Sequence, residues 1–376
     1  MTRILTAIGL MSGTSMDGVD VAVIETDGET HVKRGANASY PYPDTVKDAL
    51  RACLGLSADP DGRVKKAEEL VTDFHIGAVK KFIGNKRKPD VVGFHGHTVF
   101  HDPDNRKTWQ IGDGKKLGAA LACDVIYDFR QNDMKAGGQG APLLPLYHRA
   151  LVHGAKLDMP ACILNLGGVG NLTWIDGDKV YACDTGPGNA LLDDWMLKKT
   201  GQPMDEGGKV AIAGTVDTER VKKWMSHPYF SKKPPKSLDR NAFNHCTVDD
   251  MSLEDGAATL VAFTVVGAIN AWRQMPTHPH QMIVAGGGRK NKAIMQGLGS
   301  HVAVINADVL GWSGDSLEAE GFAYLAVRSL QNKPISLPTT TGCKAPTLGG
   351  RYVRYKPESA PLKPIVTEFK LFRDDE

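Results

Sequence analysis

A turn suited to binding phosphate lies near the start of the chain. Residues 9–20 read Gly-Leu-Met-Ser-Gly-Thr-Ser-Met-Asp-Gly-Val-Asp, between apolar runs at 4–10 and 19–24. This pattern predicts a strand, a tight turn and a second strand, with backbone N–H groups and the hydroxyls of Ser12, Thr14 and Ser15 around an anion. Asp17 and Asp20 would repel a phosphate unless a cation lay between them, which indicates Mg²⁺. The alternative is an ordinary hairpin with a polar turn.

Two further glycine-rich turns, at 167–170 and 286–288, follow strand-like runs. Three such turns in a chain of alternating strands and helices indicate a nucleotide that is held from both sides of a cleft. The sequence has neither a Walker P-loop nor a Gly-x-Gly-x-x-Gly fingerprint, so the nucleotide would be bound by neither common scheme.

Asp184 is the first candidate for acid–base chemistry. It follows the strand-like run 180–183 and precedes a rigid Thr-Gly-Pro-Gly turn. A carboxylate in this position is well placed as a general base. The alternative is an N-cap for the helix expected from residue 190, a role that Asn189 would fill equally well.

Arg130 ends the strand-like run 125–129 and would clamp a carboxylate or phosphate with two hydrogen bonds. An ion pair with Asp128 or Asp133 is the alternative. Glu318 near the start of the expected helix 315–330 is a solvated acid unless it faces a cleft.

The three histidines at 95, 97 and 101 lack the spacing of a metal site and are interpreted as hydrogen-bonded turn residues. The glycine-rich segment 137–142 is a hinge, a loop or a linker.

Composition limits the classes of function. The 376 residues suffice for two or three domains, and a net charge of +2 gives no electrostatic case for nucleic acid or an anionic membrane. We expect no apolar run to approach the length of a membrane span. The six cysteines are scattered, as expected for reduced thiols in a cytoplasmic protein. Because the strand–turn–strand pattern occurs twice, we expect a duplicated α/β fold whose two lobes share a cleft.

Together these motifs resemble the anhydro-N-acetylmuramic acid kinase family. The matching stretches keep the family order between about residues 8 and 345, and they are 11–20, 94–98, 128–130, 137–142, 165–171, 184–189, 286–288 with Asn291, and 318–319.

The resemblance implies two duplicated actin-like (ribonuclease H-like) α/β lobes with a nucleotide cleft between them. The first lobe would comprise residues 1–130, with part of 345–376 packed on it. The second lobe would comprise residues 131–344, and residues 351–376 would form a polar tail.

The resemblance also implies the site. Asp184 would be the catalytic base, and Asp17 would hold Mg²⁺ through water. The sugar would contact Arg130, Glu318, His97 and Thr98. The implied ATP-binding residues are Gly13, Thr14, Ser15, Met16, Asp17, Gly18, Val19, Asp20, Gly167, Gly168, Gly170, Asn171, Gly286, Gly287, Gly288 and Asn291.

The implied reaction converts 1,6-anhydro-N-acetylmuramic acid, ATP and water into N-acetylmuramic acid 6-phosphate and ADP, a step of peptidoglycan recycling. A homodimer is implied as well. The alternatives are a kinase of another anhydrosugar such as levoglucosan, an actin-like ATP-binding scaffold, and a sugar-sensing regulator.

The chain departs from the family pattern at two places. The family commonly has glutamine where this chain has His97, and Thr-Gly where it has Leu238-Asp239. The sequence alone assigns no role to the second of these segments.

Overall fold

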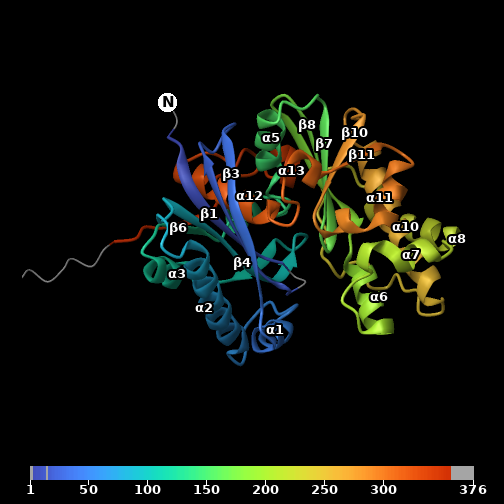
Figure 1. Ribbon diagram of the computed structural model, residues 1–376, viewed down its shortest axis with the longest axis horizontal. Helices are drawn as coiled ribbons and strands as arrows, with labels where there is room; N and C mark the ends of the chain where they lie inside the picture. The colour runs from blue at the N-terminus through green and yellow to red at the C-terminus, as the bar shows by residue number, and fades with distance from the viewer. Residues whose placement is uncertain (1–2, 14–15, 357–376) are drawn as a thin grey trace, which may run out of the picture.

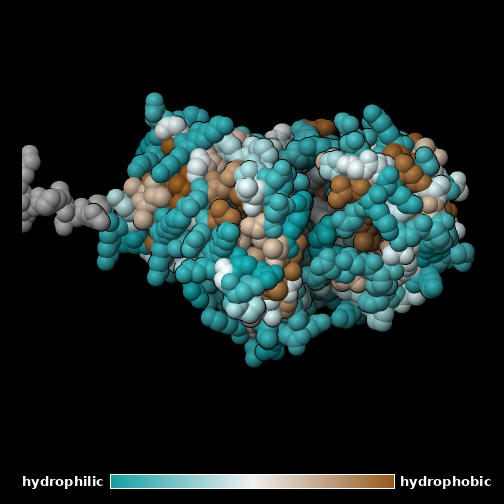
Figure 2. Space-filling view, turned by 90° about the horizontal axis from the view of Figure 1, so that it is seen from below, coloured by the Kyte–Doolittle hydropathy of each residue, from teal (hydrophilic) through white to brown (hydrophobic). Residues whose placement is uncertain are grey.

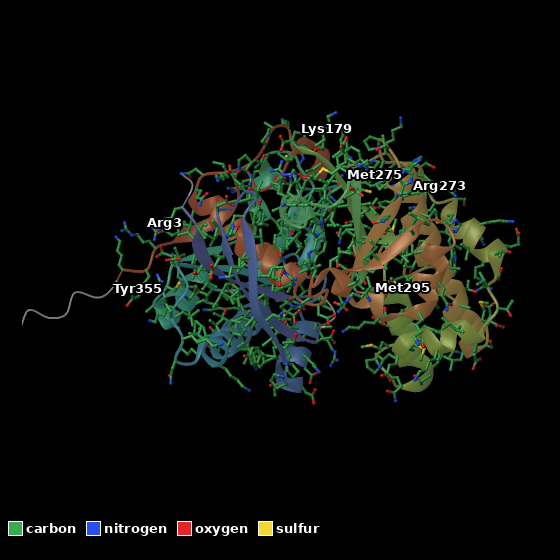
Figure 3. The ribbon with its side chains drawn as sticks, turned by 45° about the horizontal axis from the view of Figure 1, so that its top comes forward. Arg3, Lys179, Arg273, Met275, Met295 and Tyr355 are labelled. Carbon is green, nitrogen blue, oxygen red and sulfur yellow. The ribbon has the colours of Figure 1, made fainter. Side chains whose placement is uncertain are left out.

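The structure is a computed structural model that describes residues 3–13 and 16–356 (Figure 1). The predicted polar tail therefore lies largely outside the described residues. The surface is mostly hydrophilic and is hollowed between the two lobes (Figure 2). The labelled residues near the two described ends, Arg3 and Tyr355, both lie on the first lobe (Figure 3).

The first lobe is built on a seven-stranded sheet. Strands β1, β2 and β3 form an antiparallel meander, and β4 and β6 continue the sheet parallel to β1. The order is β3 (Val32–Pro41), β2 (Gly18–Thr26), β1 (Leu5–Ser12), β4 (Val91–Asp102), β6 (Val125–Tyr127) and β12 (Arg351–Val353), with β5 (Lys107–Ile111) paired to β4.

The second lobe repeats this arrangement. Its five strands run in the order β9 (Lys179–Pro187), β8 (Val169–Asp176), β7 (Ala161–Leu166), β10 (Gln281–Ala285) and β11 (Ala303–Asn306). Here too the first three strands of the lobe form an antiparallel meander and the last two run parallel to the first. The matching orders and directions confirm the predicted duplicated α/β fold.

Helices cover both sheets (Figure 1). Those of the first lobe are α1 (Asp44–Arg51), α2 (Arg63–Ile83) and α3 (Gly114–Leu121), and α4 (Gln131–Lys135) and α5 (Pro145–Gly154) lead to the second lobe. The second lobe carries α6 (Ala190–Thr200), α7 (Lys209–Ala213), α8 (Thr218–Met225), α9 (Pro228–Ser231), α10 (Leu253–Arg273) and α11 (Lys292–Gly299), and α12 (Leu317–Leu330) and α13 (Pro338–Thr341) follow.

Helix α12 packs on the first sheet, although it follows the strands of the second. It contacts β1, β2 and β4. Glycines make the close approach possible, since a Cβ at Gly9 would meet the Ala319 carbonyl at 1.7 Å and one at Gly93 would meet the Phe322 carbonyl at 2.2 Å. This packing differs from the predicted division, which places all of 131–344 in the second lobe. Strand β12 pairs with β6, so part of the segment after residue 345 does lie on the first lobe.

Helix α10 is long and apolar enough to cross a membrane by length and composition, with a mean hydropathy of 1.3. The expectation that no apolar run approaches that length is therefore wrong for this helix. However, 72% of its apolar window is buried inside the protein, against α6, α7, α8, α11 and β9. This burial is typical of the core helix of a globular protein.

Strand β4 is longer than the sequence predicts. The apolar pattern ends near residue 94, but pairing with β5 extends the strand to Asp102. His95, His97 and His101 therefore lie within a strand rather than in a turn.

Candidate active site

Asp184 lies near the end of β9 and is held by the segment that follows α9. Its Oδ2 accepts a hydrogen bond from the Leu238 backbone N–H at 2.8 Å, and its own N–H donates to the Lys236 carbonyl at 2.8 Å. The Tyr229 hydroxyl donates to its backbone carbonyl at 2.7 Å. Asp184 is therefore not an N-cap. Asn189 makes no side-chain cap either, because its Nδ2 donates to the Leu166 carbonyl.

The surroundings of Asp184 raise the pKa of its carboxyl into the neutral range. Burial raises the pKa of the Asp184 carboxyl to about 7, against the opposing effects of the Leu238 N–H and the Arg130 charge. A carboxylate with a pKa close to the working pH is suited to exchange protons with a reacting group.

Arg130 is held by neutral acceptors. Its Nε and one terminal nitrogen lie 3.2 Å and 3.1 Å from His95 Nε2, and its other terminal nitrogen donates to the Gly140 carbonyl at 2.7 Å. Neither predicted ion pair forms, because Asp128 pairs with Arg351 at 2.8 Å and Asp133 accepts from Gly140 N–H at 2.7 Å.

Electrostatic effects connect Arg130 with two carboxylates. Burial lowers the pKa of Arg130, while the charges of Glu318 and Asp184 raise it. Arg130 therefore lies within electrostatic reach of both acids, and it keeps N–H groups that can serve an anionic ligand.

Glu318 lies in the first turn of α12 and is not a solvated helix-start acid. Its Oε1 accepts from the Asn165 Nδ2 at 3.0 Å, and burial raises the pKa of its carboxyl against the opposing Arg130 charge. Asn165 is in β7, so Glu318 joins α12 on the first sheet to the second sheet. The structure thus brings Asp184, Arg130 and Glu318 to one place between the lobes.

His97 lies apart from this group. The ring is fully buried, and its Nδ1 lies 2.8 Å from Ser12 Oγ, which also accepts from the Tyr42 hydroxyl at 2.9 Å. The Ser12 hydroxyl is therefore engaged inside the first lobe and is not free for a phosphate. Thr98, the next residue, does line the cleft between the lobes, and its hydroxyl accepts from Gln110 Nε2.

The second and third glycine-rich turns meet at the ends of β7 and β10. The Gly167 and Gly168 carbonyls accept hydrogen bonds from the N–H groups of Gly188, Asn189 and Ala190. Gly286 has φ +75°, and a Cβ there would lie 2.6 Å from the Leu166 carbonyl oxygen. Gly170 and Asn171 start β8 beside these turns, and Gly287 and Gly288 follow Gly286. Asn291 caps α11, where its Oδ1 accepts from Ile294 N–H, so its side chain has a structural role.

The first turn faces the second lobe. Thr14 and Ser15 lie outside the described residues, whereas Gly13 and Met16 close the turn through a hydrogen bond from Met16 N–H. Gly18, Val19 and Asp20 begin β2, and Asp17 is exposed.

Burial and the charges of Asp194 and Asp17 raise the pKa of Asp193, in the first turn of α6, to about 7. Asp17 and α6 therefore lie within electrostatic reach across the cleft.

A cleft of about 810 Å³ separates the two lobes, and its wall includes Leu238, whose N–H holds Asp184. Its walls come from the end of β4 and Gln139 on one side and from residues 227–242 on the other.

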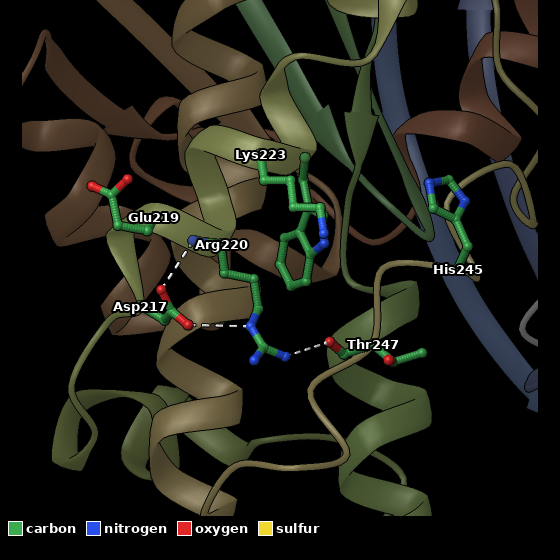
Figure 4. Close-up of a pocket in the computed structure, with 7 residues that line it drawn as sticks. Asp217, Glu219, Arg220, Lys223, His245 and Thr247 are labelled. Carbon is green, nitrogen blue, oxygen red and sulfur yellow. Dashed lines mark hydrogen bonds and ion pairs between the residues drawn. The ribbon is translucent and has the colours of Figure 1, made fainter.

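A second hollow, of about 460 Å³, lies on the second lobe around α8 (Figure 4). There the Arg220 guanidinium donates to Asp217, to Asp250 and to the Thr247 carbonyl. Its charge is therefore already paired within the protein.

Sequence reasoning missed the residues that position the catalytic group. The 236–238 segment was left without a role, yet it holds Asp184 on both sides. His95 and Asn165 belong to stretches noted in the sequence, but their contacts to Arg130 and Glu318 join residues 35 and 153 positions apart. No local pattern signals such a contact.

Comparison with known proteins shows the family to which the chain is similar. The family model described as anhydro-N-acetylmuramic acid kinase matches residues 5–354. The anhydro-N-acetylmuramic acid kinase of Paramagnetospirillum magneticum is 48% identical over 356 residues, which cover 92% of this chain and 99% of the relative. That of Nitrobacter winogradskyi is 47% identical over 364 residues, or 93% of this chain and 100% of the relative.

A solved structure of the activator of the 2-hydroxyisocaproyl-CoA dehydratase from Clostridium difficile with bound ADPNP aligns with a TM-score of 0.43 and 13% identity. The alignment covers 87% of this chain and 96% of that chain. This likeness is distant, and the fold assignment rests on the repeated strand order.

Proposed function

The chain belongs to the anhydro-N-acetylmuramic acid kinase family, and we propose that its reaction takes place in the cleft between the lobes, with Asp184 as the general base. The enzyme opens the 1,6-anhydro ring of 1,6-anhydro-N-acetylmuramic acid with water and phosphorylates O6, giving N-acetylmuramic acid 6-phosphate and ADP. The observation that carries the assignment of the base is the buried Asp184 carboxyl, whose pKa lies at about 7 beside Arg130.

The proposed chemistry begins at a water molecule near Asp184. The carboxylate removes a proton from the water, the water oxygen bonds to the anomeric carbon, and the bond from that carbon to O6 breaks. O6 then bonds to the γ-phosphorus of ATP, and the bond from this phosphorus to the oxygen shared with the β-phosphate breaks to release ADP. Asp184 finally returns its proton to solvent.

Arg130 and Glu318 would bind the sugar. Arg130 retains N–H groups beyond those used by His95 and Gly140, and such groups suit the lactyl carboxylate of the substrate. Glu318 is fixed by Asn165 and would accept a hydrogen bond from a sugar hydroxyl. For His97, whose ring contacts Ser12, we propose an indirect role in holding the first turn.

The glycine-rich turns would surround the phosphates of ATP. Mg²⁺ would neutralise the charge that develops on the γ-phosphoryl group. Asp17 and Asp193, which come from the two lobes, would hold the ion through water. Within residues 3–13 and 16–356, no three His, Cys, Asp or Glu side chains are arranged as a ready metal site. This arrangement fits an ion held through water and phosphate oxygens, with Asp17 as one outer partner.

Three coarser assignments complete the proposal. We place residues 3–130 in the first lobe together with α12 and β12, because these two elements pack on its sheet. The protein would act in the cytoplasm, where its six buried free cysteines remain reduced. It would form a homodimer, as the family resemblance implies.

The pH dependence of turnover tests the role of Asp184. Because the base must be deprotonated, kcat/KM for the sugar at saturating Mg²⁺-ATP should fall below a midpoint of about 7, the pKa to which burial raises this carboxyl. Well below the midpoint, the rate should drop about tenfold for each pH unit. Steady-state rates across the acid range check this. A midpoint near the ordinary aspartate value would remove Asp184 from this role.

Release of ADP, coupled to NADH oxidation, tests the function itself. We expect turnover with Mg²⁺-ATP and 1,6-anhydro-N-acetylmuramic acid, and none with N-acetylmuramic acid, which has no anhydro bridge to open. Levoglucosan serves as the matched anhydrosugar without the acetamido and lactyl groups. Turnover with levoglucosan alone would change the substrate and keep the mechanism, whereas ATP binding without any sugar-dependent turnover would favour a scaffold.

A further inference from the structure

Three residues with unpartnered polar atoms line the cleft. Within the described part of the chain, nine buried side-chain nitrogen or oxygen atoms have no hydrogen-bond partner. His101 Nε2, Gln139 Oε1 and Ser237 Oγ are among them, and all three residues are in the cleft wall. Buried polar atoms are almost always hydrogen-bonded in folded proteins, so such a group in one cleft indicates atoms that await a ligand.

One ring nitrogen of His101, Nδ1, contacts Thr108, whereas the other, Nε2, has no hydrogen-bond partner. Its Nδ1 lies 3.0 Å from Thr108 Oγ1, which also accepts from Gln110 Nε2 at 2.7 Å. Burial and the Arg130 charge lower the pKa of His101 to about 4, so the ring is neutral at pH 7. With the proton on Nδ1 and donated to Thr108, Nε2 presents a lone pair, that is, a hydrogen-bond acceptor.

Gln139 lies in a loop that is rigid rather than a flexible linker. Its N–H donates to the Thr341 carbonyl at 2.9 Å. The buried carboxylate of Asp133 accepts from the Gly140 N–H at 2.7 Å and from the hydroxyls of Ser336 and Thr341. These hydrogen bonds fix the backbone of the loop at Gln139.

The same loop connects these acceptors to the catalytic group. The Gly140 carbonyl, one residue after Gln139, accepts from Arg130 at 2.7 Å. A Cβ at Gly140 would lie 3.5 Å from His101 Cε1, so His101 and this loop are neighbours. Ser237 lines the wall of the other lobe, next to Leu238, whose N–H holds Asp184.

We propose that His101 and Gln139 form a subsite for the acetamido group of the substrate, with Ser237 lining the opposite wall. This rests on the function proposed above. An amide substituent carries one N–H donor, which His101 Nε2 and Gln139 Oε1 would share, and one carbonyl acceptor, which would accept from the Ser237 hydroxyl. Levoglucosan has a hydroxyl in place of the amide. A site built around an amide discriminates against a ligand that lacks it, because its buried polar atoms stay unpaired.

Binding of a ligand series to the full chain tests the subsite without turnover. The variants are Gln139→Met, which keeps the length of the side chain, and His101→Phe, which keeps a ring, and both remove the acceptor. Gln331→Met is the matched control, because Gln331 also has a buried unpartnered Oε1, outside the cleft. The ligands are 1,6-anhydro-N-acetylmuramic acid, 1,6-anhydro-N-acetylglucosamine, which lacks only the lactyl group, and levoglucosan. Thermal unfolding checks that each variant is folded.

Calorimetric titration should show a 10- to 100-fold weaker Kd of each cleft variant for both acetamido sugars, about the range expected when a buried hydrogen bond is lost. Levoglucosan binding should change less than threefold, and Gln331→Met should leave all three Kd values unchanged. Equal weakening for levoglucosan, or weakening for the lactyl sugar alone, would overturn the subsite. Failure of the proposed function is distinguishable, since it would appear as absence of sugar-dependent ADP release by the wild-type chain.

Discussion

Replacing Asp184 with asparagine should lower kcat by about 10²–10⁴-fold, the usual contribution of a general base. The amide keeps the shape of the side chain and an oxygen that can accept from the Leu238 N–H, now 2.8 Å from Asp184 Oδ2, but it cannot remove a proton from water. ATP binding should stay close to wild type, because the glycine-rich turns do not depend on this carboxyl. Steady-state rates, together with titration by a non-hydrolysable ATP analogue, measure the two effects separately.

The matched control is Asp176→Asn, at the exposed end of β8 in the same hairpin. This variant should keep wild-type rates. Near-full turnover of the Asp184→Asn variant would show that another group is the base. An equal loss in both variants would instead indicate a general defect of the second sheet.

Stability of the Asp184→Asn variant should change in the opposite direction from activity. Burial raises the folded-state pKa of Asp184 from the ordinary aspartate value of 3.8 to about 7, so the protonated carboxyl stabilises the fold and this contribution is lost as the pH rises toward 7. Asparagine has no proton to lose. The melting temperature of the variant relative to wild type is therefore expected to increase between about pH 4 and pH 7 and to level off above pH 7.

Strand positions could be predicted because they depend on local pattern. The apolar runs at 4–10, 19–24 and 161–166 became β1, β2 and β7 within a few residues. The duplication followed from the repeated strand–turn–strand pattern, and the identical order of the two sheets confirms it. Hydrophobic periodicity reports which face of a strand is buried, and it does so without knowledge of distant contacts.

The position of α12 could not be predicted in this way. Its apolar face would suit either sheet, and chain order favours the second. The deciding feature is the absence of side chains at Gly9 and Gly93, which lets the helix backbone approach β1 and β4. A glycine within a strand signals that another backbone comes close, but it does not say which one.

In the candidate site too, local pattern predicted some features and distant contacts decided the others. Residue types and family resemblance pointed to Asp184, Arg130 and Glu318, and the structure brings these three together. His97 stays a prediction for sugar binding: its Nδ1 lies 2.8 Å from Ser12 Oγ, a contact that the sequence did not signal. The chain departs from the family pattern at Leu238-Asp239, yet Leu238 contacts Asp184 through its backbone N–H, which does not require a particular side chain.

Replacing Glu320 with glutamine should reduce the stability of the fold by about 3–5 kcal/mol, as expected when one partner of a buried ion pair is neutralised. Glu320 lies in α12 and is fully buried. Its carboxylate accepts from Arg34 Nε and a terminal nitrogen at 2.7 Å and 2.8 Å, and from the Tyr147 hydroxyl at 2.5 Å. Because Arg34 is in β3 and Tyr147 in α5, the pair ties together three elements at the junction of the lobes. Equilibrium unfolding in urea measures the loss.

The neighbouring strand offers a matched control in the exposed pair of Lys33 and Glu25, which are 3.2 Å apart. Glu25→Gln should cost at most about 0.5 kcal/mol, since water screens an exposed pair. The double variant Arg34→Met with Glu320→Gln should cost less than the sum of the two single variants. Each single variant leaves one buried charge without its partner, whereas the double variant removes both charges. Additive losses, or a Glu320→Gln cost as small as that of Glu25→Gln, would show that apolar packing holds this junction. The buried ion pair would then contribute little to holding α12 against β3 and α5.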